Sequence, residues 1–75
     1  MVMIAEEKMQ KINETLTYFM ERVNECRANK AYNMANDWLD MLLGALSIYN
    51  EIASVQLTLK EHRNGELEFE AVQKG

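Results

Sequence analysis

The chain has no proline, three glycines, one cysteine and one histidine among its 75 residues. Proline and glycine interrupt helices, and their scarcity beside many Glu, Lys, Leu, Met and Ala residues favours long helices over a sheet protein. A single cysteine, Cys26, excludes an internal disulfide and suits a reducing compartment. Because no stretch of about 18 uncharged apolar residues occurs, we expect no membrane span and a cytoplasmic location.

The residue types that most catalytic and metal sites need are also scarce. One Cys and one His cannot supply a zinc site, and no Glu-x-x-His pair is present for a di-iron site. Glycine-rich phosphate loops, nucleophile elbows and dinucleotide fingerprints are missing. His62 has the charged neighbours of a solvated helix end or turn, and Cys26 lies in an apolar row, where a free thiol acts as a small hydrophobe. We predict that the protein is not an enzyme and has no catalytic residue, metal or cofactor.

The charge of the chain is acidic, with 12 Asp and Glu residues against 8 Lys and Arg residues and a net charge of −4. This balance argues against a general nucleic-acid binder, which would carry a basic face. Acids at regular spacing form two rows that together contain Glu7, Glu14, Glu21, Glu66, Glu68 and Glu70. An alternative function is a dimeric helical regulator that binds nucleic acid or, by acidic charge mimicry, a nucleic-acid-binding protein. A solvated surface is the simpler explanation of such rows.

Apolar residues in the first part of the chain alternate in steps of three and four. This spacing predicts a helix over about residues 2–28 with one narrow apolar stripe. The stripe contains Val2, Ala5, Met9, Ile12, Leu16, Phe19, Val23 and Cys26. A helix of this kind needs about one partner helix, and the short connection that follows makes its neighbour antiparallel.

A second helix is predicted over about residues 32–62, and it is apolar over an arc of about 200° around its axis. The usual stripe of a surface helix covers about 100°, so the first helix can bury only half of this arc. We expect the other half to form an interface made of Met34, Trp38, Met41, Ala45, Ile48, Ile52 and Val55. Gly44 falls in a polar column and is explained as a tolerated defect.

Self-association would cover that interface. A single domain of 75 residues rarely gains more than about 3–5 kcal/mol from its own core. We therefore predict an all-α fold, in which two antiparallel helical hairpins dimerise into a four-helix bundle. The helical hairpin would occupy residues 1–64, and residues 65–75 would form an acidic tail that is also able to form a strand.

An α+β fold is the alternative for the C-terminal part. Here the second helix ends near residue 53, and residues 55–72 form a β-hairpin around the turn Arg63-Asn64-Gly65. This arrangement pairs Leu59 with Phe69 and Lys60 with Glu68. The all-α fold is preferred because the seven-residue columns continue unbroken through Leu59.

The function that follows from these patterns is a non-enzymatic protein–protein interaction module. It would act as a small inhibitor, adaptor or regulatory subunit through the wide apolar face of the second helix. Small proteins of this kind are typical of bacterial and phage accessory factors. We expect a homodimer that also has a protein partner.

Overall fold

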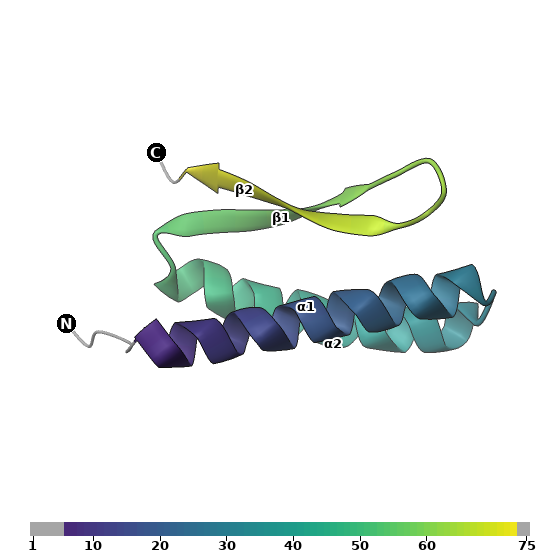
Figure 1. Cartoon of the computed structure of the whole chain (residues 1–75), viewed down its shortest axis with the longest axis horizontal. Coiled ribbons are helices and arrows are strands. Elements are labelled where there is room, and N and C mark those ends of the chain that lie inside the picture. Colours follow the sequence, from purple (N-terminus) through teal and green to yellow (C-terminus); the bar gives the residue numbers. More distant parts are fainter. Residues whose placement is uncertain (1–5, 74–75) are drawn as a thin grey trace.

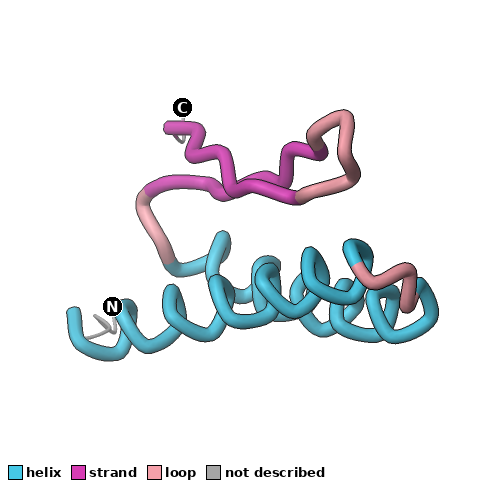
Figure 2. Tube along the Cα trace, turned by 45° about the vertical axis from the view of Figure 1, so that its right-hand side comes forward, coloured by secondary structure: helices cyan, strands magenta, loops and turns pink. Residues whose placement is uncertain are grey.

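Two antiparallel helices form one layer of the computed structural model, and a β-hairpin forms the other (Figure 1). The structure describes residues 6–73. Helix α1 spans Glu6–Ala28 and helix α2 spans Tyr32–Ile52, followed by strands β1 (Val55–Glu61) and β2 (Leu67–Gln73). Figure 2, turned by 45°, again shows the hairpin along one side of the helical pair. The helical layer therefore has one side covered by strands.

The all-α prediction is wrong, and so is the four-helix bundle built on it. Helix α2 ends at Ile52 rather than near residue 62, and the following residues form an antiparallel two-stranded sheet. The α+β alternative is confirmed, including the pairing of Leu59 with Phe69 and of Lys60 with Glu68. The predicted end of the first helix at residue 28 is confirmed, and its predicted start lies outside the described residues.

Helix α2 ends at Ile52, although its seven-residue apolar columns continue in the sequence through Leu59. Ala53 adopts an extended conformation, with φ −82° and ψ 155°. The side chain of Asn50 accepts a hydrogen bond from the backbone N–H of Leu57 at 2.8 Å and donates one to its carbonyl oxygen at 2.9 Å. A side chain that satisfies backbone groups in this way competes with further helix formation. The last turn of α2 is thus tied directly to β1.

The core lies between the two layers, where the apolar faces of all four elements meet. On β1, alternate residues point toward the helices, as expected for a strand with one buried face. Leu57 and Leu59 of β1 and Phe69 of β2 pack against the main buried cluster. The buried apolar side chains are Leu16, Val23, Ala35, Leu42, Leu46, Tyr49 and Leu67. The hairpin therefore covers part of the apolar arc of α2 that α1 does not reach.

Polar side chains of α1 hold the far end of the hairpin. Asn24 accepts a hydrogen bond from the N–H of Leu67 at 2.7 Å and donates one to its carbonyl oxygen at 3.0 Å. Arg27 donates to a carboxylate oxygen of Glu61 at 2.6 Å and to the carbonyl oxygen of Gly65 at 2.9 Å. These bonds fix the hairpin at the end opposite to Asn50.

The turn of the hairpin depends on Gly65, which has a φ of 87°. The N–H of Gly65 donates a hydrogen bond to the carbonyl oxygen of His62 at 2.9 Å. The N–H of His62 donates one to the carbonyl oxygen of Glu66, also at 2.9 Å. A three-residue loop with a left-handed glycine is a common hairpin turn, and it is the turn that the α+β alternative predicted.

The two described glycines provide a matched test of the backbone. We expect Gly65→Ala to lower the free energy of unfolding by about 1–2 kcal/mol, because a Cβ disfavours positive φ. Gly44→Ala should raise it by about 0.5–1 kcal/mol, because Gly44 is helical and a Cβ there meets open space. Urea unfolding of both variants measures this difference. Two changes of the same sign would contradict the placement of these residues.

The anchor at Asn24 provides a second test. Asn24→Ala leaves the N–H and C=O of Leu67 without their partner, and we expect a loss of about 1–3 kcal/mol in the free energy of unfolding. The amide of Leu67 should also exchange its hydrogen faster. Asn13→Ala, at an exposed position on the same helix, is the control and should change stability by less than about 0.5 kcal/mol. Equal effects of both variants would exclude an anchoring role for Asn24.

Candidate protein-docking surface

A row of apolar side chains runs along α2 on the side turned away from the hairpin. Large members of this row are strongly exposed: Met34 by 58%, Met41 by 50%, Ile48 by 61% and Ile52 by 44%. Trp38 and Ala45 are half-buried between them. At 100° per residue, Ile48 lies about 160° around the helix from Asn50, the residue that binds β1. We call this row the α2 seam; its members are Met34, Trp38, Met41, Ala45, Ile48 and Ile52.

The α2 seam contains every predicted interface residue except one. Val55 was assigned to the same row on the assumption that the helix continues. It lies in β1 instead, where it pairs with Gln73 and is half-buried. The change from helix to strand after Ile52 therefore shortens the row and turns Val55 to a different part of the molecule.

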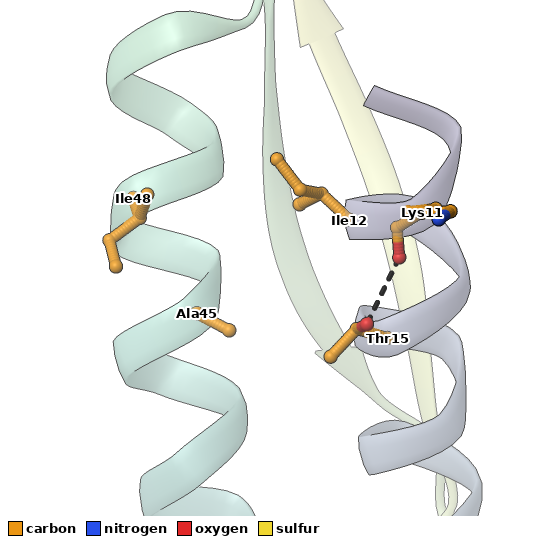
Figure 3. A pocket seen from close by; sticks show the side chains of 5 residues that line it. All are labelled: Lys11, Ile12, Thr15, Ala45 and Ile48. Atoms are coloured by element: carbon orange, nitrogen blue, oxygen red, sulfur yellow. Dashed lines mark hydrogen bonds between the residues drawn. The ribbon is translucent and has the colours of Figure 1, made fainter. Parts of the chain in front are cut away.

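A groove lies between the α2 seam and α1, with a volume of about 240 Å³ (Figure 3). Only helical residues line it: Lys11, Ile12 and Thr15 from α1, and Ala45 and Ile48 from α2. The hydroxyl of Thr15 donates a hydrogen bond to the carbonyl oxygen of Lys11 at 3.0 Å, as Figure 3 shows. Its hydrogen is thus used within the helix, and the groove suits an apolar occupant.

An aromatic cluster supports Trp38 farther along the same pair of helices. The indole of Trp38 meets the ring of Tyr18 edge-on, with centroids 5.8 Å apart, and lies 5.9 Å from the ring of Phe19. The guanidinium of Arg22 stands 5.5 Å from the centre of the Tyr18 ring, a cation–π distance. Arg22 also pairs with Glu25. These ring contacts pack Trp38 against α1 at the edge of the seam.

The acidic rows predicted from the sequence lie on two separate elements. Glu14 and Glu21 are exposed on α1, whereas Glu66, Glu68 and Glu70 are exposed on the hairpin. The side chain of Glu7 lies outside the described residues. Within the hairpin, Glu68 pairs with the ring Nε2 of His62 and sits opposite Lys60 in the sheet. His62 follows β1 in the turn, and Cys26 is a half-buried free thiol on α1.

Side chains that bind metals do not gather in the described part of the chain. Among residues 6–73, no group of three or more His, Cys, Asp or Glu side chains is arranged to hold a metal ion. None of the helices in the same range combines the length and apolar character needed to cross a membrane. No family model, curated protein or solved structure matches the chain.

The α1 side of this surface was not predicted from the sequence. Lys11, Thr15 and Tyr18 lie outside the apolar stripe of α1 and were not assigned to any interface. The sequence does indicate that Thr15 lies next to the apolar stripe, because Thr15 is three residues from Ile12 and four from Phe19. Such positions border the stripe, and they become part of the docking surface because α2 places its own exposed row next to them.

Proposed function

We propose that this protein is a non-enzymatic protein-binding module that acts through the α2 seam. The observation that carries the proposal is a continuous row in which Met34, Met41, Ile48 and Ile52 each expose about half of the side chain. Burying one such side chain contributes about 1.5–3 kcal/mol. Extended apolar patches on small proteins mark interaction sites. A surface of this kind gains free energy when another protein covers it.

The shape of the surface indicates the chemistry of its occupant. Two antiparallel helices with a shallow apolar groove between them accept an apolar stripe of another helix, as in helix-in-groove recognition. Trp38, held by Tyr18 and Phe19, is suited to be an anchor because fixed tryptophans often dominate binding energies. A module of this kind acts by occupying a surface of its partner, as an inhibitor, an adaptor or a regulatory subunit. The free thiol of Cys26 suits a reducing compartment, and we propose that the protein is cytoplasmic.

Site-specific photo-crosslinking tests the proposal. A photoreactive amino acid at Met41 or Ile48, in the seam, should form covalent adducts with protein in cells that express the chain. The same group at Asp40 or Ser47, the exposed neighbours on the polar side of α2, is the control and should give several-fold fewer adducts. Adding Ile52→Asp to the Met41 variant should abolish its adducts. Equal labelling at seam and control positions would refute the proposal.

A further inference from the structure

We propose that the free edge of β2 is a second docking site, which takes a basic, extended segment of another protein as a third strand of the sheet. The site is separate from the α2 seam, because the hairpin and the side of α1 that faces the hairpin form it. Two independent observations support the inference. β2 leaves several backbone groups open along this edge, and acidic side chains stand on both sides of them.

The hydrogen-bond pattern of the hairpin shows which backbone groups of β2 point away from β1. The N–H of His62 donates to the carbonyl oxygen of Glu66, so these two residues form a hydrogen-bonded pair. Hydrogen-bonded and non-hydrogen-bonded pairs alternate along an antiparallel ladder. By the register of the strands, the residues of β2 whose N–H and C=O groups face outward are Leu67, Phe69, Ala71 and Gln73.

Asn24 of α1 already binds one position of this edge. Its side-chain amide binds both the N–H and the C=O of Leu67, at 2.7 Å and 3.0 Å, as a peptide group of a neighbouring strand would. Phe69, Ala71 and Gln73 present the same two groups at the next outward positions. No side chain among residues 6–73 bonds to them. Successive open positions of this kind fit another extended backbone, which is recognition by strand addition.

The free edge of β1 is less open than that of β2. The side chain of Asn50 binds the outward N–H and C=O of Leu57, in the middle of β1. A strand added beyond this point can reach only Leu59 and Glu61. The edge of β2 has its side-chain ligand at the first residue instead, so the rest of the strand is continuous. We therefore place the site on β2.

Acidic side chains border the open stretch on the outer face of the sheet. Glu68 and Glu70 alternate with the open positions and are exposed. A residue of an added strand would stand opposite each of them, with Cβ atoms about 5 Å apart. Glu68 also pairs with His62 and lies opposite Lys60, whereas Glu70 lies opposite the uncharged Thr58. A base on the added strand would gain most from Glu70.

Two further acids stand on α1, beneath the same stretch. Asn24 marks the side of α1 that faces the edge of β2. Glu14 and Glu21 are exposed, and at 100° per residue they lie about 60–80° from Asn24, on the side away from the buried Leu16. β2 runs opposite to α1 (Figure 1). With rises of about 1.5 Å and 3.3 Å per residue, the two acids are level with about residues 68–72 of β2.

Basic side chains of the helices lie away from the open stretch. Three bases of α1 point about 140–160° from Asn24, toward the opposite side of the helix; they are Lys8, Lys11 and Arg22. Arg27 binds Gly65 in the hairpin turn, and Lys30 follows α1 at the same end. Lys74 lies outside the described residues. Acids thus flank the open edge on both sides, and they favour an added strand that has basic side chains.

A second copy of the chain does not fit this edge. Paired strands lie about 4.8 Å apart, whereas the axes of packed helices need about 8–10 Å. α1 extends beneath the outer side of β2, because Asn24 reaches the outward groups of Leu67. A two-fold that pairs β2 antiparallel with its copy would therefore place two α1 helices in the same space. A single extended segment has no helical layer and fits above α1.

Amide hydrogen exchange of the full chain with synthetic peptides tests the inference. The probe has the length of β2, 7 residues, and alternates lysine with threonine; the comparison peptide has glutamate in place of lysine. The lysine peptide at about 1 mM should slow exchange of the outward amides of Phe69, Ala71 and Gln73 by about tenfold. The glutamate peptide should slow them by less than about twofold. The amides of Glu68 and Glu70 face β1 and should exchange slowly with or without peptide.

A proline at the edge separates strand addition from general attraction between opposite charges. Ala71→Pro removes an outward N–H but no hydrogen bond to β1, and proline is tolerated on the open side of an edge strand. It should reduce the effect of the lysine peptide on Phe69 and Gln73 to less than about twofold. Val55→Pro, the matched change on the outward edge of β1, should leave the effect intact. Circular dichroism checks that both variants stay folded.

Charge reversal tests the acids at about 0.15 M ionic strength, where exposed charges more than about 8 Å apart are screened. Glu14→Lys with Glu70→Lys changes the charge on both sides of the edge and should make the glutamate peptide the more protective one. Asp37→Lys with Asp40→Lys makes the same change in net charge on exposed positions of α2. This control should keep the preference for the lysine peptide.

Several results would overturn the inference. One is a lysine peptide that slows none of the three outward amides, or slows the outward amide of Leu59 on β1 equally. Another is an Ala71→Pro variant that stays folded and responds as the wild type does. Protection of the three amides that rises with the concentration of the chain alone would identify a second copy as the occupant. Photo-crosslinking at the α2 seam depends on none of these results, so the proposed function is tested separately.

Discussion

The apolar arc of α2 is wider than any single helix can cover, and the rest of the structure depends on this excess. α1 presents a narrow stripe, whose buried members include Leu16 and Val23, and covers only part of the arc. The hairpin covers one flank, through Leu57, Leu59 and Phe69. The opposite flank is the α2 seam. A core of this size leaves little stability in reserve, so the way in which the arc is shared determines both the fold and the surface that remains.

Polar contacts decide which flank the hairpin covers. Asn50 binds Leu57 at the beginning of the hairpin, and Asn24 and Arg27 bind it near the turn. All these side chains lie on the same side of the helical layer. An isolated two-stranded hairpin is marginally stable in water, so these bonds and the leucines beneath them supply what the two strands lack. The seam stays open because no comparable polar groups attach a segment of the described chain there.

Much of this arrangement was accessible from the sequence. The end of α1, the seam positions from Met34 to Ile52 and the register of the hairpin all follow from local spacing, which reports the face of a helix or strand directly. The choice between helix and strand after Ile52 did not follow. Val55 and Leu59 fit the seven-residue columns of a helix and the alternation of a strand equally well. The deciding contacts join Asn50 to Leu57 and Asn24 to Leu67, and the second of these spans residues far apart in the chain. The α1 side of the docking surface was missed because its residues are polar or lie beside the stripe.

The central claim is that the hairpin and the α2 seam occupy opposite flanks of α2. Nuclear Overhauser effects in the isotope-labelled chain measure this most directly. The account predicts cross-peaks from the methyl groups of Leu57 and Leu59 to Leu46 and Tyr49, with none from either strand to Met41 or Ile48 of the same chain. A continuous series of helical amide-to-amide cross-peaks from Ile52 through Leu59, or strand contacts to Ile48, would contradict it.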